Sequence, residues 1–184
     1  MPPAPPDIRK RSFAPVVDAA TRLLICGSLP GERSLAAGRY YAHPQNQFWQ
    51  LLSPVAGTDL VALDYDARLA ALLTAKIGLW DVVASAARTG SSDAAIRDPA
   101  ANDLPALAAT LPDLRAIAFN GGTAAAIGLR QMRAAGLDRI DLIALPSSSP
   151  LHTIGLAAKR PAWDALRTTL GEDRRTTGFP QAPQ

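Results

Sequence analysis

The 184-residue chain contains a single cysteine and only two histidines. One thiol, Cys26, excludes an intramolecular disulfide and any cluster or zinc site built from several thiolates. Two imidazoles, His43 and His152, are too few for a multi-histidine metal site. We therefore expect a protein that needs neither a metal nor another cofactor.

Long apolar runs and a strong excess of one charge are also missing. No run approaches the roughly 20 residues that cross a bilayer, so no transmembrane helix is predicted. The first residues are rich in proline instead of basic and then apolar, unlike a secretory signal. The net charge of +3 suits a phosphate-bearing partner without indicating one. We expect a soluble, monomeric, cytoplasmic protein without membrane contact.

The chain has enough apolar residues, 48%, to bury a core, which excludes wholesale disorder. Its length suits one domain, which we place at residues 16–171. Residues 1–15 carry five prolines and the basic run Arg9–Arg11. They predict a mobile arm, either a solvated tail or a segment that touches phosphates. Residues 172–184 predict a flexible tail.

Within the domain, short apolar runs alternate with helical patterns. The runs typical of buried strands are Arg22–Gly27, Ile77–Val83, Leu114–Phe119 and Ile140–Leu145. The helical patterns are Gly31–Gly38 (a turn or two), Asn46–Val55, Tyr65–Lys76, Asn102–Thr110, an Ala-rich segment after Gly122 that ends at Gly136, and Gly155–Leu170. This alternation predicts a three-layer α/β/α sandwich around a roughly four-stranded, mainly parallel sheet.

Three unusual loops follow predicted strands: Gly27–Gly31, Asn120–Gly122 and Pro146–Pro150. In parallel sheets, ligands bind beyond the carboxyl ends of the strands. The three loops should therefore meet at one crevice. Their convergence is a stronger indication of a site than any one loop.

The Gly27–Gly31 loop places the hydroxyl of Ser28 in a turn framed by Gly and Pro. Its backbone amides are suited to hold a phosphate or polarise a water, but a plain strand-to-helix turn has the same composition. The loop lacks the Gly-Lys-Ser/Thr ending of a nucleotide-binding P-loop.

The segment Arg39–Trp49 holds four of the ten aromatic residues. Aromatics interleaved with amides suit a site that stacks on a flat base and reads its polar edge. Tyr40 or Tyr41 is a candidate stacking platform, whereas Phe48 is either a second contact to a base or a core anchor. His43 is either a proton carrier or a residue that braces the loop.

Asn120 ends a predicted strand, where its amide would offer a donor and an acceptor to a base edge, or simply form a turn. In the next loop, Ser147, Ser148 and Ser149 offer hydroxyls to phosphates. Leu151 suits a wedge that unstacks a duplex, or it packs into the core. No Ser/His/acid order or Gly-x-Ser-x-Gly elbow indicates a hydrolase triad, and these loops hold no paired carboxylates.

The chain resembles the uracil-DNA glycosylase superfamily, and within it the hypoxanthine-DNA glycosylase (DNA-deoxyinosine glycosylase) branch. The resemblance spans Leu23 to Trp163. Its motifs, in order, are Gly27-Ser-Leu-Pro-Gly31, Ser34-Leu35, Gly38-Arg-Tyr-Tyr-Ala-His-Pro-Gln-Asn-Gln-Phe-Trp49, Gly78-Leu-Trp-Asp-Val82, Phe119-Asn-Gly121 and Leu145-Pro-Ser-Ser-Ser-Pro-Leu-His152.

The resemblance implies an α/β/α fold and hydrolysis of the N-glycosidic bond of a flipped, deaminated base, without a metal. Many relatives carry Asn or Asp where this chain has Ser28, and in the hypoxanthine branch the essential amide corresponds to Asn46. Tyr41 corresponds to the aromatic that stacks on the base, and Asn120 to the base-reading amide. Ser147 stands where some relatives have His.

The loop Ser147–His152 corresponds to the one that enters the minor groove, with Leu151 as its wedge. Whether His43 or His152 stabilises the leaving base is open. The expected partner is double-stranded DNA with a damaged base, with single-stranded DNA as a second candidate. No Lys lies in the motifs, so no lyase step is expected. Alternatives are a uracil-directed glycosylase, a non-catalytic nucleic-acid binder and a hydrolase of free nucleosides.

Overall fold

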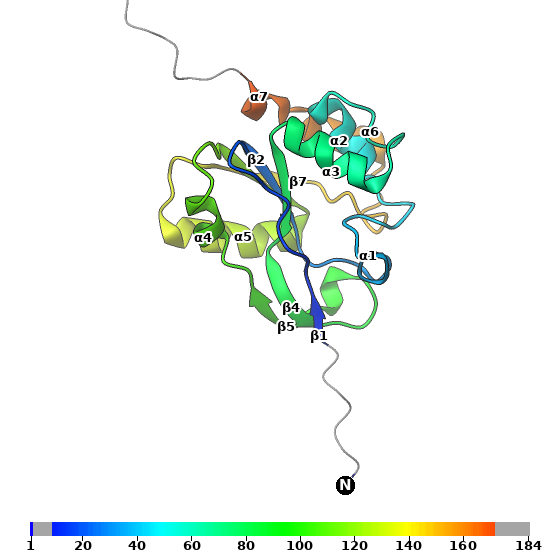
Figure 1. The fold of residues 1–184 in the computed structure, drawn as a ribbon. Helices are drawn as coiled ribbons and strands as arrows, with labels where there is room; N and C mark the ends of the chain where they lie inside the picture. Colours follow the sequence, from blue (N-terminus) through cyan, green and yellow to red (C-terminus); the bar gives the residue numbers. More distant parts are fainter. Residues whose placement is uncertain (2–8, 172–184) are drawn as a thin grey trace, which may run out of the picture.

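The computed structural model describes Met1 and residues 9–171. Its centre is a sheet of four parallel strands in the order β3-β2-β6-β7 (Figure 1). These strands are β2 (Leu23–Gly27), β3 (Ile77–Asp81), β6 (Ala116–Asn120) and β7 (Asp141–Leu145). β2, β3 and β7 lie within segments for which the sequence predicts strands, and β6 runs one residue past its predicted segment, to Asn120. The predicted four-stranded parallel sheet is confirmed.

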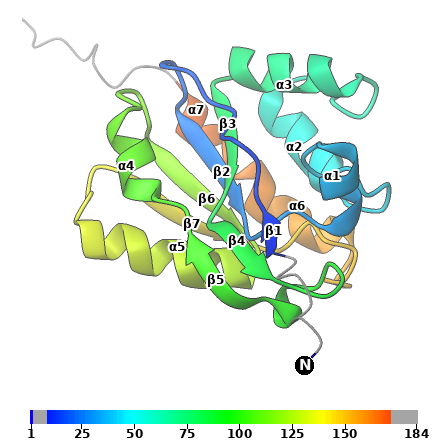
Figure 2. The ribbon, with the colours of Figure 1, turned by 60° about the horizontal axis from the view of Figure 1, so that its bottom comes forward.

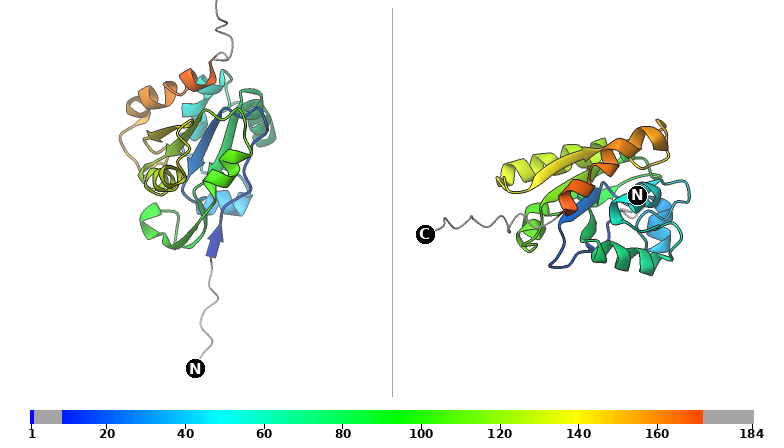
Figure 3. Two further views of the ribbon diagram at one scale, coloured as in Figure 1. Left: turned by 90° about the vertical axis from the view of Figure 1, so that its left-hand side faces the viewer. Right: turned by 90° about the horizontal axis from the view of Figure 1, so that it is seen from above.

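Helices cover both faces of this sheet (Figures 2 and 3). One face carries α2 (Phe48–Ala56), α3 (Tyr65–Thr74) and α6 (Leu156–Asp164), and the other carries α4 (Leu104–Ala109) and α5 (Gly122–Ala135). The short helices are α1 (Glu32–Ala37) and α7 (Arg167–Leu170). The three-layer sandwich is thus as predicted.

Side chains of β2 show how the sheet divides the core. Leu23 and Ile25 pack into the cluster under α2, whereas Leu24 and Cys26 pack into the cluster under α5. All four are fully buried. Successive residues of a strand point to opposite faces, so a run that is apolar at every position is buried on both sides.

A second, three-stranded antiparallel sheet was not predicted. It consists of β1 (Arg9–Arg11), β4 (Val83–Ala87) and β5 (Arg97–Ala101), with β4 in the middle and a 3-10 turn, η1 (Asp93–Ala95), before β5. The run Ile77–Val83 is therefore not one strand, because β3 ends at Asp81 and the chain enters the second sheet at Val83.

The predicted arm is wrong from Arg9 onward. Arg9–Arg11 pairs with β4, and the backbone oxygens of Phe13 and Ala14 accept hydrogen bonds from Trp80 Nε1 and Tyr40 Oη. The ordered domain thus begins before residue 16. The rest of the arm that the sequence predicts, residues 2–8, and the predicted tail, 172–184, lie outside the described residues.

Helix ends follow local hydrogen bonding. Asp103 accepts a bond from Ala106 N and caps α4. The final helical pattern is split in two, since Leu166 N bonds Trp163 O, three residues back. None of the helices in residues 9–171 is long and apolar enough to span a membrane.

Candidate active site

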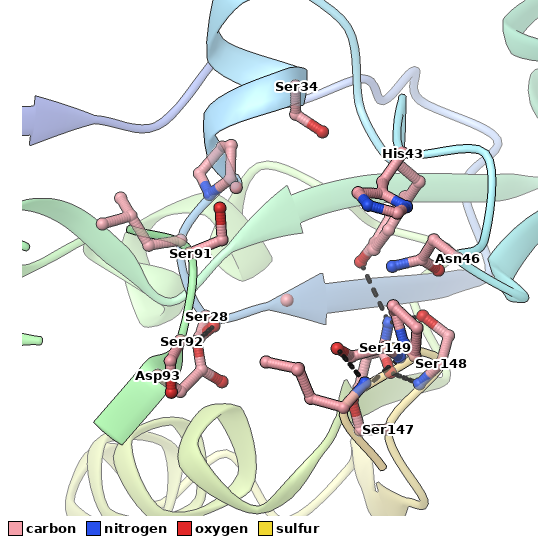
Figure 4. A pocket seen from close by; sticks show the side chains of 18 of the residues that line it. Ser28, Ser34, His43, Asn46, Ser91, Ser92, Asp93, Ser147, Ser148 and Ser149 are labelled. Carbon is pink, nitrogen blue, oxygen red and sulfur yellow. Dashed lines mark hydrogen bonds between the residues drawn. The ribbon is translucent and has the colours of Figure 1, made fainter. Parts of the chain in front are cut away.

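A pocket of about 450 Å³ lies at the carboxyl edge of the central sheet (Figure 4). All three loops predicted to converge there line it, from β2, β6 and β7. Two further segments join them: the loop before α2 and residues 91–94, which include η1. The crevice expected beyond the strand ends is therefore present.

Tyr41 lines the pocket and stacks on Phe48, with ring centroids 3.7 Å apart and planes at 9°. Phe48 is fully buried at the start of α2 and is not part of the pocket lining. The prediction that Phe48 contacts a base is therefore wrong, and the alternative of a core anchor is correct. Phe48 supports one face of the Tyr41 ring, so a ligand has only the other face to stack on.

Asn46 lies between Tyr41 and α2, and its Oδ1 accepts a bond from Phe48 N at 3.0 Å. This bond delays the start of α2 to Phe48, two residues later than predicted. Since Oδ1 is held by the backbone, the Nδ2 hydrogens are the part of the amide available to the pocket. His43 Nδ1 accepts a bond from Gln45 N at 3.1 Å, so this histidine does brace the loop.

Ser28 donates a hydrogen bond of 2.6 Å from Oγ to Asp93 Oδ1 (Figure 4). Asp93 belongs to η1, far from Ser28 in sequence. Burial raises the pKa of Asp93, while the bond from Ser28 and the charge of Arg88 oppose the rise. No sequence pattern indicated a role for this carboxyl group, because the residues around Asp93 have the composition of an ordinary loop.

Arg88 holds the Gly27–Gly31 loop against η1. Its guanidinium donates to the carbonyl oxygens of Leu29, Pro30 and Gly90. A buried guanidinium with several carbonyl partners is a rigid support. The backbone of the loop is thereby held in position at the wall of the pocket.

Asp81 ends β3 and lies in the pocket lining with only 3% of its surface exposed. Its Oδ2 is buried without a hydrogen-bond partner in the described part of the chain. Burial, reinforced by Asp93 and opposed by Arg88, raises the pKa of Asp81 to about 7. Sequence reasoning missed this residue although it lies in the motif Gly78–Val82.

Asn120 ends β6 and is paired with Ser148. Its Nδ2 donates to Ser148 Oγ at 2.8 Å and to Tyr41 Oη at 3.3 Å, and its Oδ1 accepts from Ser148 N at 2.8 Å. Both amide hydrogens are therefore used inside the protein. A base that is to be read by Asn120 has to exchange with these bonds.

The loop after β7 presents its tip to solvent. Leu151 is 69% exposed, and His152 is exposed beside it. The alternative in which Leu151 packs into the core is thus wrong. Ser147 Oγ and Ser149 Oγ accept bonds from the backbone of Ser149 and Leu151. The base of the loop is held by Lys159, whose buried Nζ donates to Ser149 O at 3.2 Å.

Among residues 9–171, no three His, Cys, Asp or Glu side chains gather as a set of metal ligands. The lining also contains no lysine in the described part of the chain. The polar groups of the pocket are three carboxyls (Glu32, Asp81 and Asp93), two amides, hydroxyls, the guanidinium of Arg33 and the imidazoles of His43 and His152.

The fold and the site define an α/β/α sandwich with a pocket, lined by both polar and apolar side chains, at the carboxyl edge of a parallel sheet. Residues 14–167 match the family model of the uracil DNA glycosylase superfamily, and the chain belongs to this superfamily.

Two curated relatives are both named hypoxanthine DNA glycosylase. The one from Methanosarcina barkeri is 44% identical over 114 residues, which cover 62% of this chain and 72% of that protein. The one from Methanosarcina acetivorans is 36% identical over 157 residues, 85% and 97% of the two chains. A solution NMR structure from Methanosarcina acetivorans, provisionally described as a uracil DNA glycosylase, has a TM-score of 0.78 at 36% identity, covering 89% of this chain and 99% of that one.

Proposed function

We propose that this protein is a monofunctional DNA glycosylase that removes a deaminated base, hypoxanthine above all, by hydrolysing its N-glycosidic bond. Membership of the superfamily and the names of the two curated relatives support this proposal. The observation that carries it is the meeting of the Tyr41 platform and the Asn46 amide in one pocket with room for a single base. A base reaches such a pocket by leaving the stack.

In the proposed reaction, the bond between the sugar and the base breaks and its electron pair leaves with the base. Positive charge then develops on the sugar and negative charge on the base. The Nδ2 hydrogens of Asn46 hold a water whose oxygen bonds to the anomeric carbon, and the proton that this water loses ends on the departing base. The carboxylate of Asp93 stabilises the positive sugar electrostatically. The products are the free base and an abasic site.

The partner that we propose is double-stranded DNA with one damaged base, and single-stranded DNA as a second substrate. The exposed Leu151 supports the duplex, because a free nucleoside needs no unstacking. We further propose that the protein acts as a monomer in the cytoplasm and does not cut the abasic strand. The absence of lysine from the described pocket lining supports the last point.

The test is incubation with labelled duplexes that carry one deoxyinosine or one deoxyuridine, followed by alkali and a gel. Cleavage at deoxyinosine only after alkali is the expected result. Cleavage at deoxyuridine alone would move the specificity to uracil. No cleavage of either duplex by folded protein would overturn the proposed function and favour a nucleic-acid binder without catalysis.

Replacing Asn46 by Ala should lower the single-turnover rate on deoxyinosine duplex by about 10²–10³-fold, because one preorganised donor is lost. Gln45→Ala is the matched control, since Gln45 is the exposed neighbour of Asn46. Circular dichroism and thermal melting verify that both variants fold. A near-wild-type rate for Asn46→Ala would show that Asn46 does not hold the water.

A further inference from the structure

The carboxyl ends of three neighbouring strands carry Asp81, Gly27 and Asn120 side by side. Gly27 is paired with Asp81 of β3, and on its other side Cys26 is paired with Phe119, so Asn120 is next to Gly27. Strands lie about 4.8 Å apart, so Asp81 and Asn120 stand about 10 Å from each other across Gly27. Asp81, Gly27 and Asn120 thus form a row along the wall of the pocket, with a polar side chain at each end.

Gly27 is essential to this row, because a Cβ there would lie 2.8 Å from Asp81 Oδ1 and 3.0 Å from Tyr41 Oη. The carboxyl of Asp81 and the hydroxyl of Tyr41 thus lie over the same glycine. The hydroxyl of the base platform and the carboxyl group are consequently close neighbours over the middle of the row.

The two ends of the row differ in their hydrogen bonds. Asn120 has both amide hydrogens and its oxygen engaged by Ser148 and Tyr41. Asp81, in contrast, has the partnerless Oδ2. A buried polar atom without a partner costs free energy, so native proteins rarely keep one without a use. Within residues 9–171, Asp81 Oδ2 is thus a buried pocket atom that no protein group satisfies.

We propose that Asp81 is a catalytic residue that binds the flipped base as a neutral carboxylic acid. This inference rests on the function proposed above. The acid O–H donates to the carbonyl oxygen of the base, and the acid C=O accepts the neighbouring ring N–H. Hypoxanthine and uracil both present such an N–H beside a C=O.

The same hydrogen bond favours departure of the base. Negative charge grows on the carbonyl oxygen of the base as the glycosidic bond breaks, and a donor aimed at that oxygen stabilises it. An ionised Asp81 would instead place its negative charge against the growing one. The activity should therefore require the protonated form.

Several groups face Asp81 and set its titration. Asp93 of η1 raises its pKa and Arg88 lowers it, but burial is the largest cause. Asp81 in turn raises the pKa of three neighbours from β2 and the loop before α2, which stay neutral near pH 7: Cys26, Tyr40 and Tyr41. With a pKa of about 7, Asp81 is mostly protonated at pH 6 and mostly ionised at pH 8.

The experiment measures single-turnover rates on deoxyinosine duplex from pH 5.5 to 9. The proteins compared are the wild type, Asp81→Asn, Asp81→Leu and the control Asp138→Asn. Asp138 suits the control because it is exposed and far from Asp81 in the sequence. We expect the wild-type and control rates to fall about tenfold per pH unit above pH 7. Asp81→Asn keeps a donor and an acceptor, so its profile should be level. Asp81→Leu should be slowed about 10²-fold or more at pH 6.

A wild-type profile that Asp81→Asn reproduces would overturn the role of Asp81 and leave the glycosylase function intact. Absence of base release by the wild type would overturn the function itself. In that case, calorimetric measurement of free hypoxanthine binding tests separately whether Asp81 binds the base as a neutral acid. We expect the wild type to bind more tightly at pH 6 than at pH 8 and Asp81→Asn to bind equally at both. Equal wild-type affinity at the two pH values would refute the proposal.

Discussion

Asp81 makes the folded protein sensitive to pH as well. In the unfolded chain an Asp has a pKa of about 3.9, whereas burial raises the pKa of Asp81 to about 7. The folded state therefore binds more protons between these values, and the free energy of unfolding falls as the pH rises from about 4 to 7. A shift of this size corresponds to a few kcal/mol, about 1.4 for each pKa unit.

Replacing Asp81 by Asn should remove this dependence. The free energy of unfolding of Asp81→Asn, relative to the wild type, should therefore increase by about 2–4 kcal/mol between pH 5 and pH 8. Urea denaturation at several pH values measures it, with Asp138→Asn as the control. A difference that stays constant with pH would mean that Asp81 is ionised in the folded protein throughout.

Single residues also differ in how well the sequence alone predicted them. The sequence predicted Asn120 and the Ser147–Ser149 run in the pocket because both belong to distinctive loops after strands. It singled out Tyr41 from the aromatic segment before α2, and Asn46 from the resemblance that this segment carries. Asp81 and Asp93 were not identified from the sequence as residues of the pocket. Whether a carboxyl group is buried depends on contacts with segments distant in sequence, which no local pattern records.

At the scale of the elements, the apolar strands were predicted and the second sheet was not. β2 and β6 are apolar at nearly every position, which marks them as buried on both faces. β4 and β5 have the sequences VASAA and RDPAA, whose Ala, Asp and Pro are poor strand formers. Their strands exist because β1 pairs with β4, a contact made across more than 70 residues.

Helix α6 supports the exposed loop through Lys159, which is only 1% exposed. Replacing Lys159 by Met keeps the buried carbon chain but removes the bond to Ser149 O. We expect KM for deoxyinosine duplex to rise several-fold while kcat changes less, because the loop that we propose to contact DNA is no longer held. Burial lowers the pKa of Lys159, which means that keeping its side chain charged costs free energy in the folded protein. The Tm of Lys159→Met should therefore not fall below that of the wild type.

Steady-state kinetics and thermal melting test this expectation, with Arg130→Met as a control on the exposed side of α5. An unchanged KM in a folded Lys159→Met variant would show that the loop keeps its conformation without the lysine.

At the scale of the whole molecule, the exposed Leu151 is at the edge of the pocket and is 69% accessible. If it fills the space that a flipped base leaves in the stack, Leu151→Ala should lower activity on deoxyinosine duplex by about 10-fold or more. Activity on single-stranded deoxyinosine should change little, since that substrate has no stack to restore.

Parallel assays with duplex and single-stranded substrates measure this ratio. Val61→Ala is a suitable control, because Val61 is also an exposed apolar residue but does not line this pocket. Equal losses on both substrates would argue against the wedge and for a role of Leu151 in shaping the pocket.

Because of its position, Cys26 can report on the separation of the strands of the central sheet. This only thiol of the chain lies fully buried in β2, the central strand that pairs with both β3 and β6. Burial raises its pKa, so almost no thiolate exists in the closed state. An alkylating reagent can therefore react with Cys26 only when the strands next to β2 separate. The rate at which Cys26 is alkylated therefore measures how often the central sheet opens. A bound damaged duplex that holds the strand ends together should lower this alkylation rate.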